Sequence, residues 1–537
     1  MRKSLAAAIS TILTIASAEA GAQTVTGTLN NYGSVSVSGG SSLNITGTGS
    51  FGNYGSLNIN SGATLNNIGI VNNGNTSYAP SPIFIGTLNN NGTLNNSGTL
   101  NNNNPGSTIN NSGTLNNTGT LSSYRLFPDA TVNNSGTLNN SGTLKTHVMN
   151  NSGTLNNSGN MQAGSYANDG GLFNSGTLNN SGRITVDAPL ENCGTLNNQA
   201  GANLFVGRSI FNSGTLNNAG TLNGNAALYN QSGGTLNNSG TLFNAQLVNN
   251  QAGATINNSG TLTGGTLLTN SGTINNSGTL NSGAVINSGT LNNEGGLNTY
   301  GLSNQSGGTL INRGTVNSNS VYNAGTFVNK GSVIGTGTFT QTAGTSQING
   351  TLTQGSVNLQ GGTVFGTGAI TSAVNNTAAT IQGGSLGGAG ALTITGSLTQ
   401  SSGGTIQEFI AGTNNFSHIT VNGLIGTAAL GGTLDILTGS SFAFAAGETF
   451  NILDATGGLT GTFGQLEFDG MFGTGSVVDI GSNLAIDAVY TNNGVTLDVV
   501  HVTPTRAPEI DPASTASGLT LLLGGMVVMR GRRRLKV

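Results

Sequence analysis

Apolar residues recur along the chain at a regular spacing, within a short polar phrase whose clearest form is S-G-T-L-N-N. The phrase stands at 135–140, 152–157, 175–180 and 213–218, and looser copies extend from Gly27 to about Lys330. In G-T-L-N the side chains of a strand alternate, so Leu faces one way and Thr and Asn the other. The next residues, N-S-G, suit a turn because Asn and Gly tolerate positive φ. The phrase therefore predicts a short strand followed by a turn.

Three rows of apolar residues repeat with the phrase, at intervals of 17 to 23 residues within the first row. The first row is Leu115, Leu138, Leu155, Leu178, Leu196, Leu216, Leu236, Ile256, Ile274, Leu291, Leu310 and Phe327. The second row follows by six residues: Leu121, Leu144, Met161, Ile184, Leu222, Leu242, Leu262, Leu280, Leu297, Val316 and Val333, with Leu204 eight residues after Leu196 as the exception. The third row precedes by six residues: Met149, Leu172, Leu190, Ile210, Leu268, Val285 and Val321. Three strands per period, each period too small to fold alone, predict an all-β, three-sided parallel β-solenoid.

Two questions about this architecture stay open at the level of sequence. A chain so rich in Asn, Ser and Gly is also typical of disorder, but regularly placed aliphatic residues argue against it. Coils of unequal length favour a right-handed β-helix. Some coils consist of three six-residue segments, namely those from Leu178 to Leu196 and from Ile256 to Ile274. Such coils instead suit a left-handed hexapeptide helix.

After Lys330 the composition changes, which divides the array into residues 21–330 and 331–500. Asn becomes rarer while Thr, Gly and Gln increase, and period-two alternation continues, as in I-T-V-N-G at 419–423 and G-E-T-F-N-I-L-D-A at 447–455. This stretch resembles the distal passenger region of autotransporter-type β-helix proteins. The resemblance implies that the β-helix continues to a C-terminal cap. The sequence departs from that family because no series of translocator-barrel strands follows residue 500.

The scarcity of charge limits the chemistry that the chain can perform. Only 6% of its residues are charged, against about 25% in ordinary domains. The array offers five scattered acids, namely Asp129, Asp169, Asp187, Glu191 and Glu294, and the three histidines His147, His418 and His501 are isolated. We therefore expect no enzymatic activity and no cofactor, since acid–base chemistry needs groups brought together. Nucleic-acid binding is not expected either, because no basic stripe exists.

Nine acidic residues lie between Glu408 and Asp498, and no Lys or Arg lies between Lys330 and Arg506. A solvated acidic face is the favoured interpretation, and a calcium site is the alternative. The single cysteine, Cys193, cannot form an internal disulfide and occupies a position where other copies of the phrase have Ser.

The N-terminus has the pattern of a secretory signal peptide over residues 1–20. Arg2 and Lys3 precede a short apolar run, and Ala18-Glu19-Ala20 is a small-x-small cleavage site. We expect export through the Sec machinery and cleavage after Ala20. An uncleaved membrane anchor is the alternative.

The C-terminus combines three signals. The linker 501–512 is rich in proline, the run 513–529 carries no charge and is just long enough to span a membrane, and the tail 530–537 is basic. The motif at the junction consists of Pro508, Glu509, Ile510, Asp511, Pro512, Ala513 and Ser514. This arrangement resembles the PEP-CTERM class of bacterial sorting signals, although Ile510 stands where that family usually has a second proline. The resemblance implies processing by an exosortase, and a plain tail anchor is the alternative.

Together these features predict an exported rod, structural or adhesive, of the bacterial cell envelope or biofilm matrix. It would be anchored in the inner membrane through residues 513–529 until processing, and would then bind exopolysaccharide or like rods through many polar contacts. A β-helix polysaccharide lyase or hydrolase and an ice-binding solenoid are the alternative functions.

Overall fold

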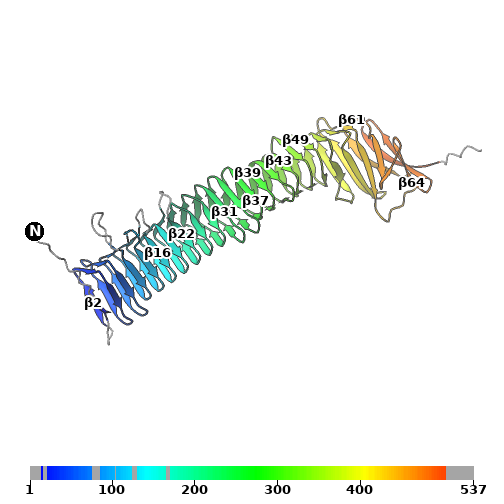
Figure 1. Ribbon diagram of the computed structural model, residues 1–537. Coiled ribbons are helices and arrows are strands. Elements are labelled where there is room, and N and C mark those ends of the chain that lie inside the picture. The colour runs from blue at the N-terminus through cyan, green and yellow to red at the C-terminus, as the bar shows by residue number, and fades with distance from the viewer. Residues whose placement is uncertain are drawn as a thin grey trace, which may run out of the picture.

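The computed structural model describes residues 14–15, 21–74, 85–102, 104–123, 130–164 and 170–502. Within these ranges the chain forms 66 β-strands and no helix. The strands stack into an elongated rod with a wider C-terminal end (Figure 1). None of the described segments is a helix long and apolar enough to cross a membrane, and the expected span at 513–529 lies outside them.

One coil of the rod consists of three strands in succession. β32 (Thr235–Asn238), β33 (Thr241–Asn244) and β34 (Leu247–Asn250) complete one circuit, and β35 (Thr255–Asn258) then pairs in parallel with β32. Up to β36 (Thr261–Thr263) each strand of the array pairs in parallel with the strand three places further on. In β39 (Thr279–Asn287), β41 (Gly296–Asn304) and β43 (Thr315–Asn323) one long strand covers two faces, so the strands there pair two places further on. The predicted all-β, parallel β-solenoid is therefore confirmed, with three strands per coil.

The three apolar rows of the sequence define the three faces, named here the Leu138, Leu144 and Met149 faces. Leu138 pairs with Leu115 and Leu155, and the first row continues residue by residue to Phe327. The Leu138 face contains β14 (Thr114–Asn117), β17 (Thr137–Asn140), β20 (Thr154–Asn157), β23 (Thr177–Asn180), β26 (Thr195–Asn198), β29 (Thr215–Asn218), β32, β35, β38 (Thr273–Asn276), β40 (Thr290–Asn293) and β42 (Thr309–Asn312).

The irregular spacing at Leu196 keeps the register of the second row. Leu204 pairs with Ile184 on one side and Leu222 on the other, as predicted. The turn before it is two residues longer, and Gly201 supports this turn with a φ of 80°. Extra residues are thus accommodated at a corner, while the apolar positions stay aligned.

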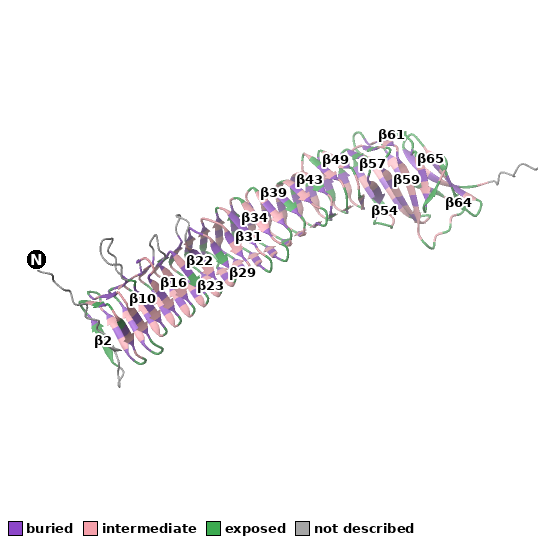
Figure 2. Cartoon of the chain, viewed as in Figure 1, coloured by how far each residue is buried: buried purple, intermediate pink, exposed green. Residues whose placement is uncertain are grey.

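Burial alternates along most strands of the array (Figure 2). In T-L-N-N the Thr and the first Asn are partly exposed, whereas the Leu and the second Asn are buried. The expectation that the Asn of G-T-L-N faces away from Leu is confirmed, whereas the second Asn, expected in the turn, is the last residue of the strand. The second is also in phase with Leu and points into the rod at the corner.

The parallel ladder crosses residue 330 without a break and ends in an antiparallel cap. Val333 pairs with Leu352, and the Leu138 face continues to β62 (Gln465–Phe468), which is the last strand to pair in parallel on it. The cap is formed by β60 (Thr449–Ala455), β63 (Met471–Phe472), β64 (Val477–Gly481), β65 (Leu484–Tyr490) and β66 (Gly494–His501), which pair antiparallel.

Candidate functional site

The outward side of the Leu138 face carries a continuous row of hydrogen-bonded asparagines. Asn257 Nδ2 donates to Asn237 Oδ1 at 2.9 Å, and Asn237 Nδ2 donates to Asn217 Oδ1 at 2.8 Å. The same contact repeats from Asn66 to Asn292, always from a residue to its equivalent in the preceding coil. We call this row the outer ladder. It exists because the first Asn of each phrase has the same register in every coil.

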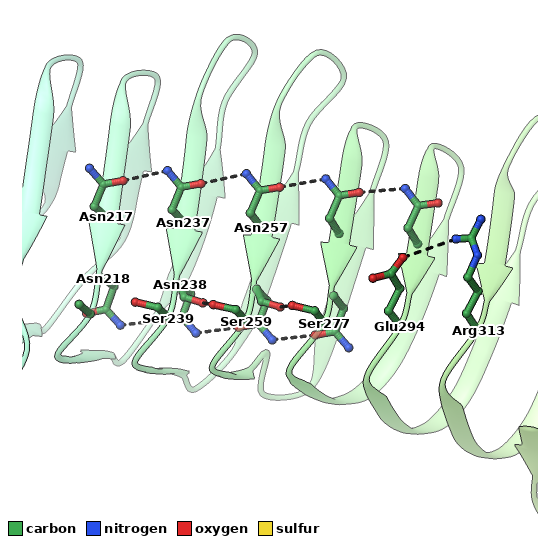
Figure 3. Close-up of a pocket in the computed structure, with 15 residues that line it drawn as sticks. Asn217, Asn218, Asn237, Asn238, Ser239, Asn257, Ser259, Ser277, Glu294 and Arg313 are labelled. Carbon is green, nitrogen blue, oxygen red and sulfur yellow. Dashed lines mark hydrogen bonds and ion pairs between the residues drawn. The ribbon is translucent and has the colours of Figure 1, made fainter. Parts of the chain in front are cut away.

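A shallow polar groove follows the outer ladder, between the Asn row and a row of turn residues that are mostly serines (Figure 3). Two stretches have volumes of about 500 Å³ and about 750 Å³. The first is lined by Asn116, Asn117, Thr118, Asn139, Asn140, Ser141, Asn156, Asn157, Ser158, Asn179, Ser181 and Gln199. The second is lined by Asn217, Asn218, Ala219, Asn237, Asn238, Ser239, Asn257, Asn258, Ser259, Asn275, Asn276, Ser277, Asn292, Glu294 and Arg313. We call the two stretches together the polar groove.

The groove is uncharged along its length and ends at a pair of charges. Among the residues that line it, only Glu294 and Arg313 are ionisable, and they form an exposed ion pair with 3.7 Å between Nη1 and Oε1. Both occupy the turn position that is Ser in the coils before them, and Lys330 follows at the same position in the next coil. A ligand lying in the groove would therefore contact only neutral amides and hydroxyls until it reached the Glu294–Arg313 ion pair.

Each outer Asn keeps unused hydrogen-bonding capacity. An amide has two N–H donors and an oxygen with two lone pairs, and the ladder uses one donor and one lone pair per residue. The remaining donor and lone pair recur once per coil, about every 4.8 Å. The groove can therefore offer a regular series of donors and acceptors.

The buried asparagines that line the groove, such as Asn238, form a second hydrogen-bonded series, which we call the inner ladder. Asn238 Nδ2 donates to Asn258 Oδ1 at 2.7 Å and to the carbonyl oxygen of Thr261 at 2.9 Å, both in the next coil. Its own Oδ1 accepts from Asn218 in the preceding coil. The donors of the inner ladder thus point toward the C-terminal end of the rod, opposite to those of the outer ladder.

The sequence-predicted sorting residues and Ala20 lie outside the described residues, as do Asp129 and Asp169. Of the three remaining array acids, Glu294 borders the groove, while Asp187 and Glu191 lie on other faces. The histidines are apart from one another. His418 Nε2 lies 3.3 Å from Asp454 Oδ2. The sequence pattern did not predict this contact, because the two residues are far apart along the chain.

Some acidic residues of 408–498 lie in pairs, since Asp435 is in register with Glu467 and Asp487 with Asp498. Within the described ranges, no group of three or more Asp, Glu, His or Cys side chains lies close enough together to hold a metal ion. Desolvation, and then the neighbouring charge of Asp435, raise the pKa of Glu467. Glu408 differs from the others because it is fully buried and neither carboxyl oxygen has a hydrogen-bond partner. Burial raises its pKa well above the ordinary value.

Cys193 lies exposed in a turn, and its backbone N–H donates to Asn174 O at 2.8 Å, as Ser175 does to Asn151 O.

The chain matches no known protein-family model and no curated protein sequence. Its functional interpretation consequently depends on the geometry described above.

Proposed function

We propose that this chain is an exported rod of the bacterial cell envelope or biofilm matrix, and that its polar groove binds neutral matrix polysaccharide or the equivalent surface of like rods. The observation that carries this proposal is the outer ladder, which repeats one arrangement of amide groups over successive coils without interruption by charge. We assign the chain no chemical reaction.

The binding would be multivalent. A neutral hydrogen bond contributes only about 0.5–1.5 kcal/mol against competition from water. Many such bonds on one rigid support raise the overall affinity without any single strong site. The ladder reduces the entropic cost of binding, because each outer Asn side chain is already fixed by its neighbours in adjacent coils.

The polar groove also favours salt-tolerant binding. Contacts between neutral groups are little affected by ionic screening, whereas charge-driven adhesion weakens as salt rises. The Glu294–Arg313 ion pair limits the length of neutral surface that is available, because a neutral polysaccharide chain would have to displace it to extend further along the groove.

Export and anchoring belong to the same proposal and rest on the residue patterns of the two ends. Residues 1–20 would direct the chain to the Sec machinery, and residues 513–529 would hold it in the inner membrane. An exosortase would then act at 508–514 and transfer the rod to the cell surface or extracellular matrix. With its antiparallel cap next to the anchor, the rod would present its Asn-rich array away from the membrane.

The test compares substitutions on two faces of the folded rod. A variant with Asn217, Asn237 and Asn257 all changed to Ala removes three members of the outer ladder. The matched control changes Asn281, Asn298 and Asn317, which form a similar outward series on the Leu144 face. Binding to the producing cells' exopolysaccharide is then measured at low and high salt.

We expect the first variant to lose several-fold in affinity at both salt concentrations and the control to bind as the unchanged protein does. A series of whole-coil deletions between 113 and 325 should reduce binding gradually. Equal losses in both variants, or collapse of binding in high salt, would contradict the proposal.

A further inference from the structure

A separate cleft on the Leu144 face combines charges that are rare elsewhere in the array. It has a volume of about 460 Å³ and lies across β18 (Thr143–Thr146), β21 (Asn160–Ala163) and β24 (Arg183–Val186). Its lining includes Lys145, Gln162, Arg183, Thr185 and Asp187. Lys145 comes from one coil and Arg183 and Asp187 from another, and the stacking of the coils brings them to one cleft.

Lys145 and Arg183 are the cations of this cleft, and both are exposed. Lys145 lies in register with Gln162, and Gln162 in turn with Thr185, while Arg183 starts the same strand as Thr185. The two cations are therefore two coils apart, roughly 10 Å along the rod. Neither forms an ion pair with another described residue, and Arg183 Nε makes only a long contact of 3.5 Å with Thr185 Oγ1.

Asp187 supplies a fixed acceptor at the edge of the same cleft. Its side chain is 4% exposed, and its Oδ2 accepts a 2.7 Å hydrogen bond from Gln162 Nε2. In the described residues this carboxylate is paired with Gln162 and forms no ion pair with Lys145 or Arg183. The cleft therefore keeps two cations available for an external anion, and it keeps amide and hydroxyl groups between them.

We propose that this cleft binds a uronate unit of an acidic polysaccharide. A uronate carries one carboxylate, which Lys145 and Arg183 can bind by charge-assisted hydrogen bonds. It also carries hydroxyl groups, which can donate to Asp187 and exchange hydrogen bonds with Gln162 and Thr185. The volume is in the range of small-ligand sites and admits one or two sugar rings.

This site is distinct from the polar groove in both position and physical character. The groove lies on the Leu138 face and is neutral, whereas the cleft lies on the Leu144 face and has an excess of positive charge. Binding at the cleft should therefore weaken as salt rises, and it should depend on the ligand's charge. The rod would then have one charge-selective site in addition to its salt-tolerant face.

The experiment measures binding of oligogalacturonate to the full chain by calorimetry, with its fully methyl-esterified form as the neutral comparison. Lys145→Gln and Arg183→Gln should each weaken oligogalacturonate binding roughly tenfold, since each removes a hydrogen bond to a charged group. Lys145→Arg keeps the charge and should bind within a few-fold of the unchanged protein. Lys330→Gln removes an exposed cation that lines neither the cleft nor the polar groove, so it serves as the control and should have no effect.

The outcomes distinguish binding of the carboxylate from binding of the sugar ring. Equal binding of the ester, or unchanged affinity in both Gln variants, would overturn the proposal. Equal affinity for acetate and for oligogalacturonate would also overturn it, because a sugar site must gain from the hydroxyl contacts. Since all the substituted side chains point outward, an unaltered thermal unfolding midpoint will show that the variants are folded. Loss of neutral polysaccharide binding would report on the groove instead.

Discussion

The buried side-chain amide of Asn238 donates a 2.7 Å hydrogen bond to the Oδ1 atom of Asn258, one coil further along the rod. The partly exposed neighbour Asn237 makes the same type of contact in the opposite direction, because it accepts from Asn257 at 2.9 Å. Two adjacent residues of one type therefore belong to different ladders, one inside and one outside. Their separate contributions can be measured by single substitutions.

Asn238→Ala should destabilise the coil much more than Asn237→Ala. The inner substitution leaves the Nδ2 group of Asn218 and the Oδ1 atom of Asn258 buried without this partner, at about 1–3 kcal/mol for each unsatisfied group. The outer substitution exposes its neighbours to water, so we expect a change within about 0.5 kcal/mol. Hydrogen exchange of the backbone amides in 235–261 measures the local effect. Similar exchange in both variants would show that the inner ladder does not stabilise the rod.

The apolar stack beneath the ladders gives a second prediction. Leu236 is fully buried between Leu216 and Ile256. Leu236→Asp buries an unpaired charge in this stack and should cost roughly 4 kcal/mol or more. Thr235→Asp, on the outward side of the same strand, is the control and should be tolerated. Limited proteolysis should cleave only the first variant near this coil, and equal resistance of the two would refute the inward placement of Leu236.

The buried carboxyl of Glu408 predicts a dependence of stability on pH. It lies on β56 (Thr405–Gly412) opposite Ile436, and its folded pKa is raised well above the ordinary value of 4.5 by burial. His418 lies on the antiparallel neighbour β57 (Asn415–Asn422) and Asp435 on the parallel neighbour β59 (Thr433–Thr438). Both side chains occupy outward, partly exposed positions and do not neutralise Glu408. A raised folded pKa means that the folded state holds the proton more tightly. The stabilising effect is therefore complete below about pH 4.5 and is lost as pH rises toward the folded pKa.

Unfolding of the C-terminal region, followed by circular dichroism across this pH range, checks the effect. The unchanged protein should become less stable between acid and neutral pH, and Glu408→Gln should lose that slope. Glu448→Gln, which alters a half-exposed carboxyl in the cap, should keep it. If the unchanged protein and Glu408→Gln show the same slope, another group is responsible.

Much of the solenoid could be predicted because its signal is one-dimensional. Each apolar row recurs once per coil, so the register of Leu138 with Leu155 follows from counting residues, and even the shift at Leu204 was visible. The two ladders are harder to separate. The Asn residues of T-L-N-N are chemically identical, and only strict alternation from Leu236 to Asn238 indicates that the second one is buried.

The remaining features depend on contacts that no local pattern records. Lys145 and Arg183 are 38 positions apart, and they face one cleft only because two coils separate them. The antiparallel cap arises from pairing of β65 with β66 and of β66 with β60, which period-two alternation alone does not distinguish from parallel pairing. The isolation of Glu408 likewise becomes visible only when neighbouring strands surround it.

The last prediction concerns the sorting signal at 508–514. If an exosortase processes the chain there, the exported protein should lack the basic tail 530–537 and should end within or near the motif, whereas the precursor retains Val537. Mass spectrometry of the C-terminal peptide from membrane and extracellular fractions measures both forms. Replacing Pro508 and Glu509 with Ala should block processing, because these two residues match the Pro-Glu of the family motif. The altered precursor should then accumulate at the inner membrane, held by the uncharged run 513–529. A control substitution of Thr505 by Ala, in the linker before the motif, should leave processing unchanged. Recovery of exported protein with an intact Val537 would instead identify the C-terminus as a permanent anchor.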